Sequence, residues 1–185
     1  KDFPNQVTTY LNLFKNIEIK NDSVLDLGCG PGHHSRVFLE NGFKIKGIDL
    51  STEMIAIAQK EVLDGDFEVM DILDLKLESE SFDGIWASAS LLHIPKNKIK
   101  SVLKVLKRLL VQDGVLYISL KQGNGSEVIK DNRYHGVDKY YVYYQPEEIN
   151  ELLISVGFKI IEKEQKERRS FYDTNPWIHI FSKKE

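Results

Sequence analysis

The stretch that decides the fold is Val24-Leu25-Asp26-Leu27-Gly28-Cys29-Gly30-Pro31-Gly32. Its first four residues form a short, mostly apolar run that predicts a strand, and helical spacing of apolar residues begins after the glycines. Glycines in a turn between a strand and a helix let a ligand approach the backbone closely, because glycine has no Cβ. Asp49 ends the next predicted strand, where a carboxylate can accept hydrogen bonds from both hydroxyls of a ribose. The two features together predict a nucleoside site at the carboxyl ends of the strands.

Short β-rich runs alternate with helical periodicity along the rest of the chain. Strands that alternate with helices imply parallel βαβ units, and the last two strands have no helix between them, so the final strand is expected to run antiparallel. The predicted fold class is therefore a three-layer α/β sandwich, with residues 1–185 as a single domain. We expect strands at 24–27, 44–49, 67–71, 82–87, 114–120, 158–161 and 177–181, and helices after Pro4, before Asn41-Gly42, after the N-cap candidate Ser51, from Pro95 to Leu110 and from Pro146 to Gly157, with a polar stretch from about Lys121 to Lys139.

The bulk composition limits the class of protein. A chain of 185 residues is long enough for one domain with a sizeable core. No run approaches the roughly 18 apolar residues that a membrane helix needs, and the N-terminus carries no recognisable secretory signal. The single cysteine, Cys29, cannot form an internal disulfide, which favours a reducing cytoplasm. The formal net charge of −3 argues against DNA or RNA as the main partner, and no metal site is expected.

The glycine spacing discriminates between two nucleoside cofactors. A dinucleotide site prefers Gly-x-Gly-x-x-Gly, with the pyrophosphate at the N-terminus of the following helix. Here the glycines are 28, 30 and 32, so the third stands one residue early. S-adenosylmethionine has no phosphate and needs no such cradle, so the spacing favours it over NAD. An obvious Tyr-x-x-x-Lys pair, which would support a nicotinamide-dependent oxidoreductase, is also missing, because Tyr140 and Tyr144 are followed four residues later by Tyr144 and Glu148.

Five motifs follow one another along nearly the whole chain. Residues 26–32 are the glycine-rich turn, and Gly47-Ile48-Asp49-Leu50-Ser51 with Met54 is the acidic motif after the second strand. Residues 82–87, 91–95 and 109–117 cover the fourth strand, the loop after it and the approach to the fifth strand. In this order they resemble the motifs of the class I S-adenosylmethionine-dependent methyltransferases. The resemblance implies a Rossmann-like fold with a seven-stranded, mostly parallel sheet whose last strand is antiparallel.

The same resemblance implies a cofactor site for S-adenosylmethionine at the strand ends. Gly28, Gly30 and Gly32 would line the methionine part, and Asp26 would help to hold its ammonium group. The other cofactor-binding assignments are Asp49 on the ribose, Leu50 and Met54 beside the adenine, Asp71 and Ile72 at the adenine amino group, and Ser88 at the end of the fourth strand. Core packing is the alternative for Met54. A surface turn is the alternative for Asp71, with Asp74 as a nearby competitor.

Methyl transfer from a sulfonium is an in-line displacement, so the main task of the protein is orientation. A base helps only where the acceptor must lose its proton early. His93, in the loop after the fourth predicted strand, is the candidate for that base or for a contact with the acceptor. A structural role in holding the loop is the alternative.

The acceptor pocket is expected among aromatic and basic residues that precede Pro146. The candidates are Tyr143, Tyr144 and Arg133, with Tyr140, Tyr141 and His135 nearby, although packing and solvent exposure would explain them about as well. A small molecule is the expected acceptor, with a protein side chain as the alternative. Ser88-Ala89-Ser90-Leu91 stands where enzymes that methylate the amino groups of DNA bases usually carry Asn/Asp/Ser-Pro-Pro-aromatic, and Cys29 lies inside the cofactor loop.

Two rival functions stay open at this point. A module could bind the cofactor or its demethylated product and regulate a partner without transferring the methyl group, because the cofactor motifs do not require turnover. An NAD-dependent oxidoreductase is the second rival, and the glycine spacing disfavours it.

Overall fold

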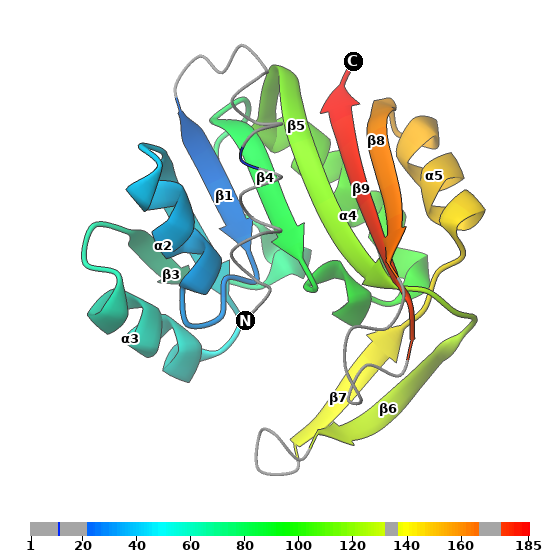
Figure 1. Ribbon diagram of the computed structural model, residues 1–185, viewed down its shortest axis with the longest axis horizontal. Helices are drawn as coiled ribbons and strands as arrows, with labels where there is room; N and C mark the ends of the chain where they lie inside the picture. The colour runs from blue at the N-terminus through cyan, green and yellow to red at the C-terminus, as the bar shows by residue number, and fades with distance from the viewer. Residues whose placement is uncertain (1–10, 12–21, 132–136, 167–174) are drawn as a thin grey trace.

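The computed structural model describes residues 11, 22–131, 137–166 and 175–185 (Figure 1). Its centre is a seven-stranded sheet with the order β3-β2-β1-β4-β5-β9-β8. All pairings are parallel except those of β9, which runs antiparallel to both β5 and β8. The strands are β1 (Ser23–Leu27), β2 (Lys44–Asp49), β3 (Asp66–Val69), β4 (Phe82–Ser88), β5 (Leu110–Lys121), β8 (Phe158–Lys166) and β9 (Trp177–Lys184). The predicted α/β fold with an antiparallel last strand is confirmed.

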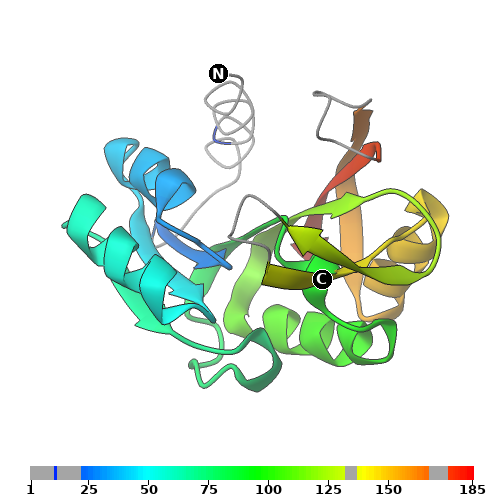
Figure 2. The same cartoon turned by 90° about the horizontal axis from the view of Figure 1, so that it is seen from below.

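Helices cover both faces of the sheet, as the view from below shows (Figure 2). The helices α2 (His33–Glu40) and α3 (Thr52–Glu61) lie on one face, and α4 (Lys96–Leu109) and α5 (Pro146–Ser155) lie on the other. This is why β1 and β4 are apolar almost without interruption. In β1, Val24 packs with Phe38 of α2, whereas Leu25 and Leu27 pack on the α4 side.

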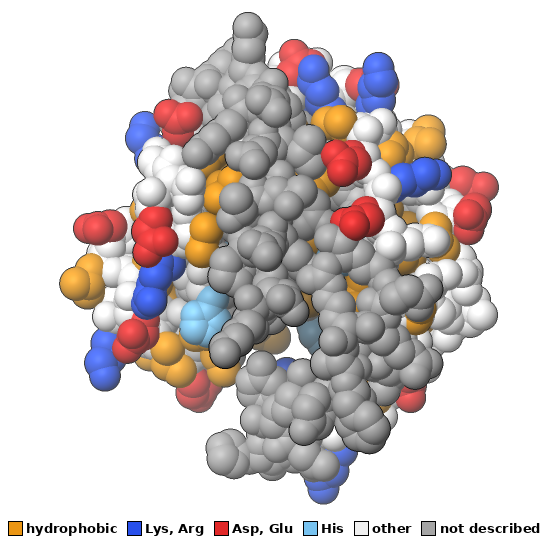
Figure 3. Space-filling view, viewed as in Figure 1, with side chains coloured by type: hydrophobic (Ala, Val, Ile, Leu, Met, Phe, Trp, Pro, Cys, Tyr) orange, Lys and Arg blue, Asp and Glu red, His pale blue; other side chains and the backbone are white. Residues whose placement is uncertain are grey.

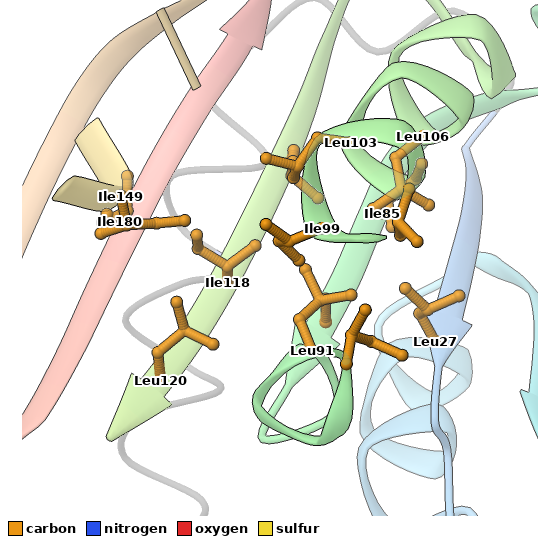
Figure 4. Close-up of a cluster of buried hydrophobic side chains, with 14 of the residues drawn as sticks. Leu27, Ile85, Leu91, Ile99, Leu103, Leu106, Ile118, Leu120, Ile149 and Ile180 are labelled. Carbon is orange, nitrogen blue, oxygen red and sulfur yellow. The ribbon is translucent and has the colours of Figure 1, made fainter. Parts of the chain in front are cut away.

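The larger core cluster fills the space between the sheet and α4 (Figure 4). Leu103 and Leu106 of α4 face Ile85 of β4 and Ile118 of β5, and all four side chains are fully buried. Their spacing along α4 gives the helix one apolar stripe, as the sequence predicts. The core holds β4 and β5 in place, and with them the loops that follow these strands.

The helix boundaries agree with the sequence signals. The Ser51 hydroxyl accepts a hydrogen bond from the backbone amide of Met54 at 3.2 Å and so caps α3. Pro95 precedes α4 and Pro146 opens α5. The predicted helix after Pro4 lies outside the described residues apart from Leu11, which is helical and buried.

Three parts of the β structure were not predicted. A separate hairpin, β6 (Ser126–Asp131) with β7 (Val137–Val142), begins within the stretch interpreted as polar connection and runs on past its end at Lys139. Strand β5 begins at Leu110 rather than at 114, because Leu110 pairs with Phe82 before a register shift. Strand β8 runs on to Lys166 because its polar residues continue the ladder with β9 at the edge of the sheet, where no apolar alternation is needed.

The sheet has its topological switch point between β1 and β4. The chain passes from β1 to β2 and β3 on one side, and then from β4 to β5 on the other. Ligands of open α/β sheets bind at such a point, at the carboxyl ends of the strands. The hairpin of β6 and β7 projects from the same edge (Figure 1).

The surface and the helices add two further observations. On the described part of the face shown in Figure 3, acidic and basic side chains are intermixed rather than gathered by sign. None of the helices in the described ranges is long and apolar enough to cross a membrane.

Candidate active site

The glycine-rich turn after β1 lies directly against the loop after β4. Gly28, Gly30 and Gly32 have φ angles of 74°, 54° and 83°, a region in which other residues are strained. A Cβ on Gly28 would lie 2.5 Å from the Cβ of Ser90, and one on Gly32 would lie 3.0 Å from Cγ2 of Val62. A Cβ on Gly30 would meet nothing within 4 Å. The fold itself therefore requires glycine at 28 and 32, whereas Gly30 borders open space.

Asp49 at the end of β2 is tied to this turn. Its carboxylate accepts the backbone amide of Gly30 through Oδ2 and that of Ser51 through Oδ1, both at 2.9 Å. Each carboxylate oxygen can accept more than one hydrogen bond, so the group can still serve as an acceptor for a ligand. The structure thus brings together the two features on which the nucleoside prediction depends.

The residues assigned to the adenine lie around the ends of β2 and β3. The backbone amide of Met70 donates to the carbonyl of Asp49 at 3.0 Å, which joins the two strand ends. Leu50 is 71% exposed at the end of β2, and Met54 is half-buried. An apolar ring can lie against such a surface.

The sequence predicts that Asp71 ends the third strand. This is wrong, because β3 stops at Val69. Asp71 instead caps the short helix η1 (Ile72–Asp74) by accepting the amide of Leu73 at 2.8 Å. Its carboxylate is exposed and Ile72 is half-buried. Asp74, the competitor, pairs with Lys76 on the surface at 3.1 Å. The adenine assignment of Asp71 stays a prediction.

Asp26 is the buried acid of the site, with 1% of its surface exposed. The Ser35 hydroxyl of α2 donates to its Oδ2 at 2.6 Å. Burial raises the pKa of Asp26 to about 7, against the hydrogen bond from Ser35, and the charge of Asp49 raises it slightly further. A nearby cation such as an ammonium group would favour the ionised form of this carboxyl.

The loop after β4 is held by two serines. The Ser119 hydroxyl of β5 accepts the backbone amide of Ala89 at 2.9 Å and lies 3.5 Å from the hydroxyl of Ser88. Ser90 Oγ is buried and has no hydrogen-bond partner among the described residues. Ser88 ends β4 beside this loop, and its assignment to the cofactor stays a prediction. No pattern in the sequence marks Ser90 or Ser119.

His93 ends the short helix η2 (Leu91–His93) at the same edge. Its Nδ1 lies 2.7 Å from the carbonyl oxygen of Tyr140 in β7, and its ring centroid lies 4.9 Å from that of Tyr141. Burial lowers the pKa of His93, which outweighs the Tyr140 carbonyl, and the charges of Lys139 and Lys121 lower it further. The lowered pKa favours the neutral imidazole, and its contacts with the hairpin also hold the loop.

The candidates for the acceptor pocket lie in different surroundings. The Tyr143 hydroxyl donates to Glu127 of β6 at 2.6 Å, within the hairpin. Tyr144 is fully buried beneath Lys96, beside a cavity of about 410 Å³ between α4 and α5. Arg133 and His135 lie outside the described residues. The side chains of Tyr143 and Tyr144 therefore lie in different surroundings, although the residues are consecutive. The assignment of both to the acceptor pocket stays a prediction.

The residues at the switch point fit S-adenosylmethionine. Gly30 leaves room beside the backbone, Asp49 offers a carboxylate, and Leu50 offers an exposed apolar contact. The buried hydroxyl of Ser90 beside Gly28 offers one more polar group. No group of three or more metal-binding side chains gathers in the part of the chain that the structure describes.

Comparisons with known proteins agree with this geometry. A family described as "Methyltransferase domain" matches residues 24–114. A malonyl-[acyl-carrier protein] O-methyltransferase of Enterobacter lignolyticus is 33% identical over 93 residues, which cover 50% of this chain and 36% of that protein. A ubiquinone biosynthesis O-methyltransferase of Coxiella burnetii is 25% identical over 159 residues, covering 79% of this chain and 67% of the relative.

A solved S-adenosylmethionine-dependent methyltransferase from Methanosarcina mazei superposes with a TM-score of 0.82 at 22% identity, over 93% of this chain and 96% of the other. That likeness supports the fold. The glycine turn, Asp49 and the loop after β4 all lie within the segment that matches the family, at the ends of β1, β2 and β4. Residues 24–114 thus match a methyltransferase domain, and the fold of the chain is that of S-adenosylmethionine-dependent methyltransferases.

Proposed function

We propose that this chain is an enzyme that transfers a methyl group from S-adenosylmethionine to a small-molecule acceptor. The observation that carries the proposal is the contact of Asp49 with the open glycine turn at Gly30, at the switch point of a methyltransferase domain. Both relatives given above are named as O-methyltransferases, which supports oxygen as the acceptor atom. Since the chain spans only part of the length of those relatives, its activity and substrate are proposals of their own.

In this proposal the cofactor lies along the carboxyl ends of β1, β2 and β4. Asp49 accepts from the ribose hydroxyls, and Gly30 borders the methionine part. Leu50, Met54 and Ile72 contact the adenine, with Asp71 accepting from its amino group. Asp26 stabilises the ammonium group from below, while Gly28, Gly32 and Ser88 shape the backbone around it.

The acceptor side of the site is formed by the loop after β4 and by the hairpin. When bound, S-adenosylmethionine would supply an electrophilic methyl group, with its sulfur as the leaving group. The chain's own residues orient the acceptor for in-line attack, which can contribute several kcal/mol. Where the acceptor carries a proton, His93 accepts it at Nε2, since Nδ1 faces the Tyr140 carbonyl. Tyr143, Tyr144 and Arg133 stay the candidates for the pocket wall.

Two further expectations belong to the same proposal. Residues 1–185 form one domain, and the enzyme works in the cytoplasm. The second expectation rests on the single, buried cysteine, Cys29, which has no partner in the chain for a disulfide.

The test begins with calorimetric titration of S-adenosylmethionine and its demethylated product. Asp49→Ala is expected to weaken the binding of both by about a hundredfold, because a charge-assisted pair of hydrogen bonds to the ribose is lost. Asp64→Ala, an exposed acid of the same type, is the matched control and should bind as the wild type does. No binding of either ligand to the wild type would overturn the proposal.

A second measurement separates an enzyme from a silent binding module. Release of the demethylated product is followed with a panel of phenols, carboxylic acids and amines as acceptors. Turnover of one or more acceptors, lost in Asp49→Ala, supports the enzyme. Tight cofactor binding without turnover of any acceptor would favour the module.

A further inference from the structure

The cavity of about 410 Å³ between α4 and α5 lies on the face of the sheet opposite α2 and α3 (Figure 2). Its volume is within the range of pockets that hold small molecules. The residues assigned to the cofactor all lie in the described ranges, and none of them lines it. Among its lining residues only Tyr144 is also a candidate for the acceptor pocket. The full lining is Lys96, Ile99, Tyr144, Glu148, Glu151, Leu152 and Ser155.

The hydroxyl of Tyr144 is the polar group of this cavity that needs a partner. Tyr144 is 0% exposed, and its hydroxyl has no hydrogen-bond partner among the described residues. An unpaired buried hydroxyl destabilises a fold by an amount that a hydrogen bond would recover. Burial, followed by the charge of Glu148, raises the pKa of this phenol, so it stays protonated and can donate as well as accept. A ligand with a polar atom in the cavity would satisfy this group.

The charged residues of the lining leave one carboxylate unpaired. The ammonium nitrogen of Lys96 lies 2.6 and 2.8 Å from the two carboxylate oxygens of Glu148, and 4.9 Å from the centroid of the Tyr144 ring. Glu151, one turn further along α5, takes part in none of the ion pairs among the described residues. The unpaired charge of the described lining is therefore negative. Three further cations of α4 are exposed and do not line the cavity: Lys98, Lys100 and Lys104.

We propose that this cavity binds a small organic ammonium ion, with its nitrogen beside Glu151 and the Tyr144 hydroxyl and its apolar part against Ile99 and Leu152. An ammonium group can donate both to the carboxylate and to the phenol oxygen, and the bond to the carboxylate is charge-assisted. A neutral molecule of the same shape would gain only the phenol contact, and an anion would be repelled by Glu151. This site goes beyond methyl transfer and does not depend on it.

The test uses three probes of one shape: benzylamine, the neutral benzyl alcohol and the anion benzoate. Each is titrated into the isotope-labelled protein, with and without the demethylated cofactor product, and the backbone amide resonances are followed by nuclear magnetic resonance. Benzylamine is expected to give saturable shifts at residues 96–99 and 148–155 in both titrations. Benzyl alcohol should bind there about three- to fivefold more weakly, since an exposed carboxylate adds little more than this. Benzoate should give no saturable shift at these residues.

Two variants with matched controls identify the groups that bind the probes. Glu151→Gln should weaken benzylamine about three- to fivefold and leave benzyl alcohol unchanged, whereas Glu147→Gln, at an exposed acid of the same helix, should change neither. Tyr144→Phe should weaken both probes about fivefold without lowering Tm, because it removes an unpaired buried hydroxyl. Tyr143→Phe loses its bond to Glu127, so it should lower Tm and bind both probes normally.

Three results would overturn the inference: no saturable shift with benzylamine, equal binding of benzylamine and benzyl alcohol, or benzylamine binding that ignores both Glu151→Gln and Tyr144→Phe. Binding of S-adenosylmethionine is measured separately by calorimetry. Failure of the amine site would therefore leave the proposed function intact, and failure of cofactor binding would leave the amine site intact.

Discussion

The Nδ1 atom of His93 lies 2.7 Å from the carbonyl oxygen of Tyr140, which stands 47 residues further along the chain. A carbonyl oxygen can only accept, so Nδ1 carries the proton and Nε2 keeps its lone pair. Desolvation of the ring, although His93 keeps an exposed surface, lowers the pKa of the imidazole and so favours its neutral form. The hairpin thus fixes one tautomer of a histidine that is ready to accept a proton.

Replacing His93 with asparagine tests this role. Asparagine places an amide nitrogen near the position of Nδ1 and provides no base at the position of Nε2. For an acceptor that loses a proton, we expect kcat to fall about 10²–10³-fold, with little change in KM or in Tm. His33→Asn, at an exposed histidine of α2, is the control and should leave kcat unchanged. An undiminished kcat in His93→Asn would reduce His93 to holding the loop.

The pH profile gives an independent check on His93. The neutral form is the active one, so the rate is full above its pKa and falls as the pH drops through it. Because that pKa is lowered, the acid limb of kcat should lie below pH 6.5. Lys121→Gln removes one cation and should move the limb towards higher pH. An acid limb of kcat at or above pH 6.5 in the wild type would contradict a lowered pKa of His93.

The three glycines of the turn are expected to respond differently to alanine. Gly28→Ala combines a left-handed φ with a clash against Ser90, so a loss of about 3 kcal/mol or more in the free energy of unfolding is expected. Gly30→Ala should cost only about 1–2 kcal/mol, because its Cβ meets nothing. Gly42→Ala, also left-handed and open, is the matched control for strain.

Cofactor affinity then distinguishes the two open glycines. Gly30→Ala should weaken S-adenosylmethionine at least about tenfold, since the new methyl group occupies the space beside the turn. Gly42→Ala should bind the cofactor normally. Equal affinities in calorimetry would show that the open space at Gly30 is not used by the ligand.

Asp26 should make stability depend on pH. Its pKa is about 7 in the folded protein and 3.8 in its unperturbed state, so folding disfavours the ionised form. Stability is therefore lost as the pH rises from about 4 to about 7. Asp26→Asn keeps an oxygen for Ser35 and cannot ionise. It should be more stable than the wild type at pH 8, by up to roughly 4 kcal/mol, and the difference should vanish near pH 4.

Thermal unfolding of both proteins across this pH range measures the effect. Asp64→Asn, an exposed acid, is the control and should follow the wild type at every pH. A difference between Asp26→Asn and the wild type that does not change with pH would mean that Asp26 titrates normally. The same variant should bind S-adenosylmethionine more weakly, because the ammonium group loses its anionic partner.

The parts of the fold that the sequence predicted are those with a local physical cause. Strand β2 is predicted at residues 44–49 and forms at Lys44–Asp49, where Ile45, Gly47 and Ile48 are buried between more polar neighbours. Gly28 and Gly32 mark places where the backbone needs positive φ. The position of Asp49 beside the glycine turn could be predicted, because Asp49 ends the strand that follows this turn in the sequence.

The parts that escaped prediction depend on contacts between distant segments. The residues of β6 carry Val128 and Ile129 side by side among polar neighbours, so no period of two is visible in them. Without the hairpin, neither the contact of His93 with Tyr140 nor the position of Lys121 over Tyr141 can be inferred. Asp71 was placed in a strand because the pattern does not mark where the apolar run of β3 gives way to η1.

Ser90 provides the sharpest test of where the cofactor binds. Its hydroxyl is buried next to Gly28 and has no hydrogen-bond partner among the described residues, and an unsatisfied buried hydroxyl destabilises a fold. Ser90→Ala should therefore leave the free energy of unfolding unchanged or raise it by up to about 1 kcal/mol. Ser119→Ala removes the acceptor of the Ala89 amide and should lower it by about 1–3 kcal/mol.

Ser119→Ala should lower the free energy of unfolding more than Ser90→Ala does. Cofactor affinity, corrected for this difference in stability, should instead fall more in Ser90→Ala. If the Ser90 hydroxyl donates to the bound cofactor, Ser90→Ala weakens S-adenosylmethionine by about five- to tenfold although the apo protein is no less stable. Ser119→Ala acts only through the loop and changes affinity less. A Ser90→Ala protein that is destabilised yet binds the cofactor normally would show instead that the hydroxyl has a structural partner, and would move the cofactor away from the contact between Gly28 and Ser90.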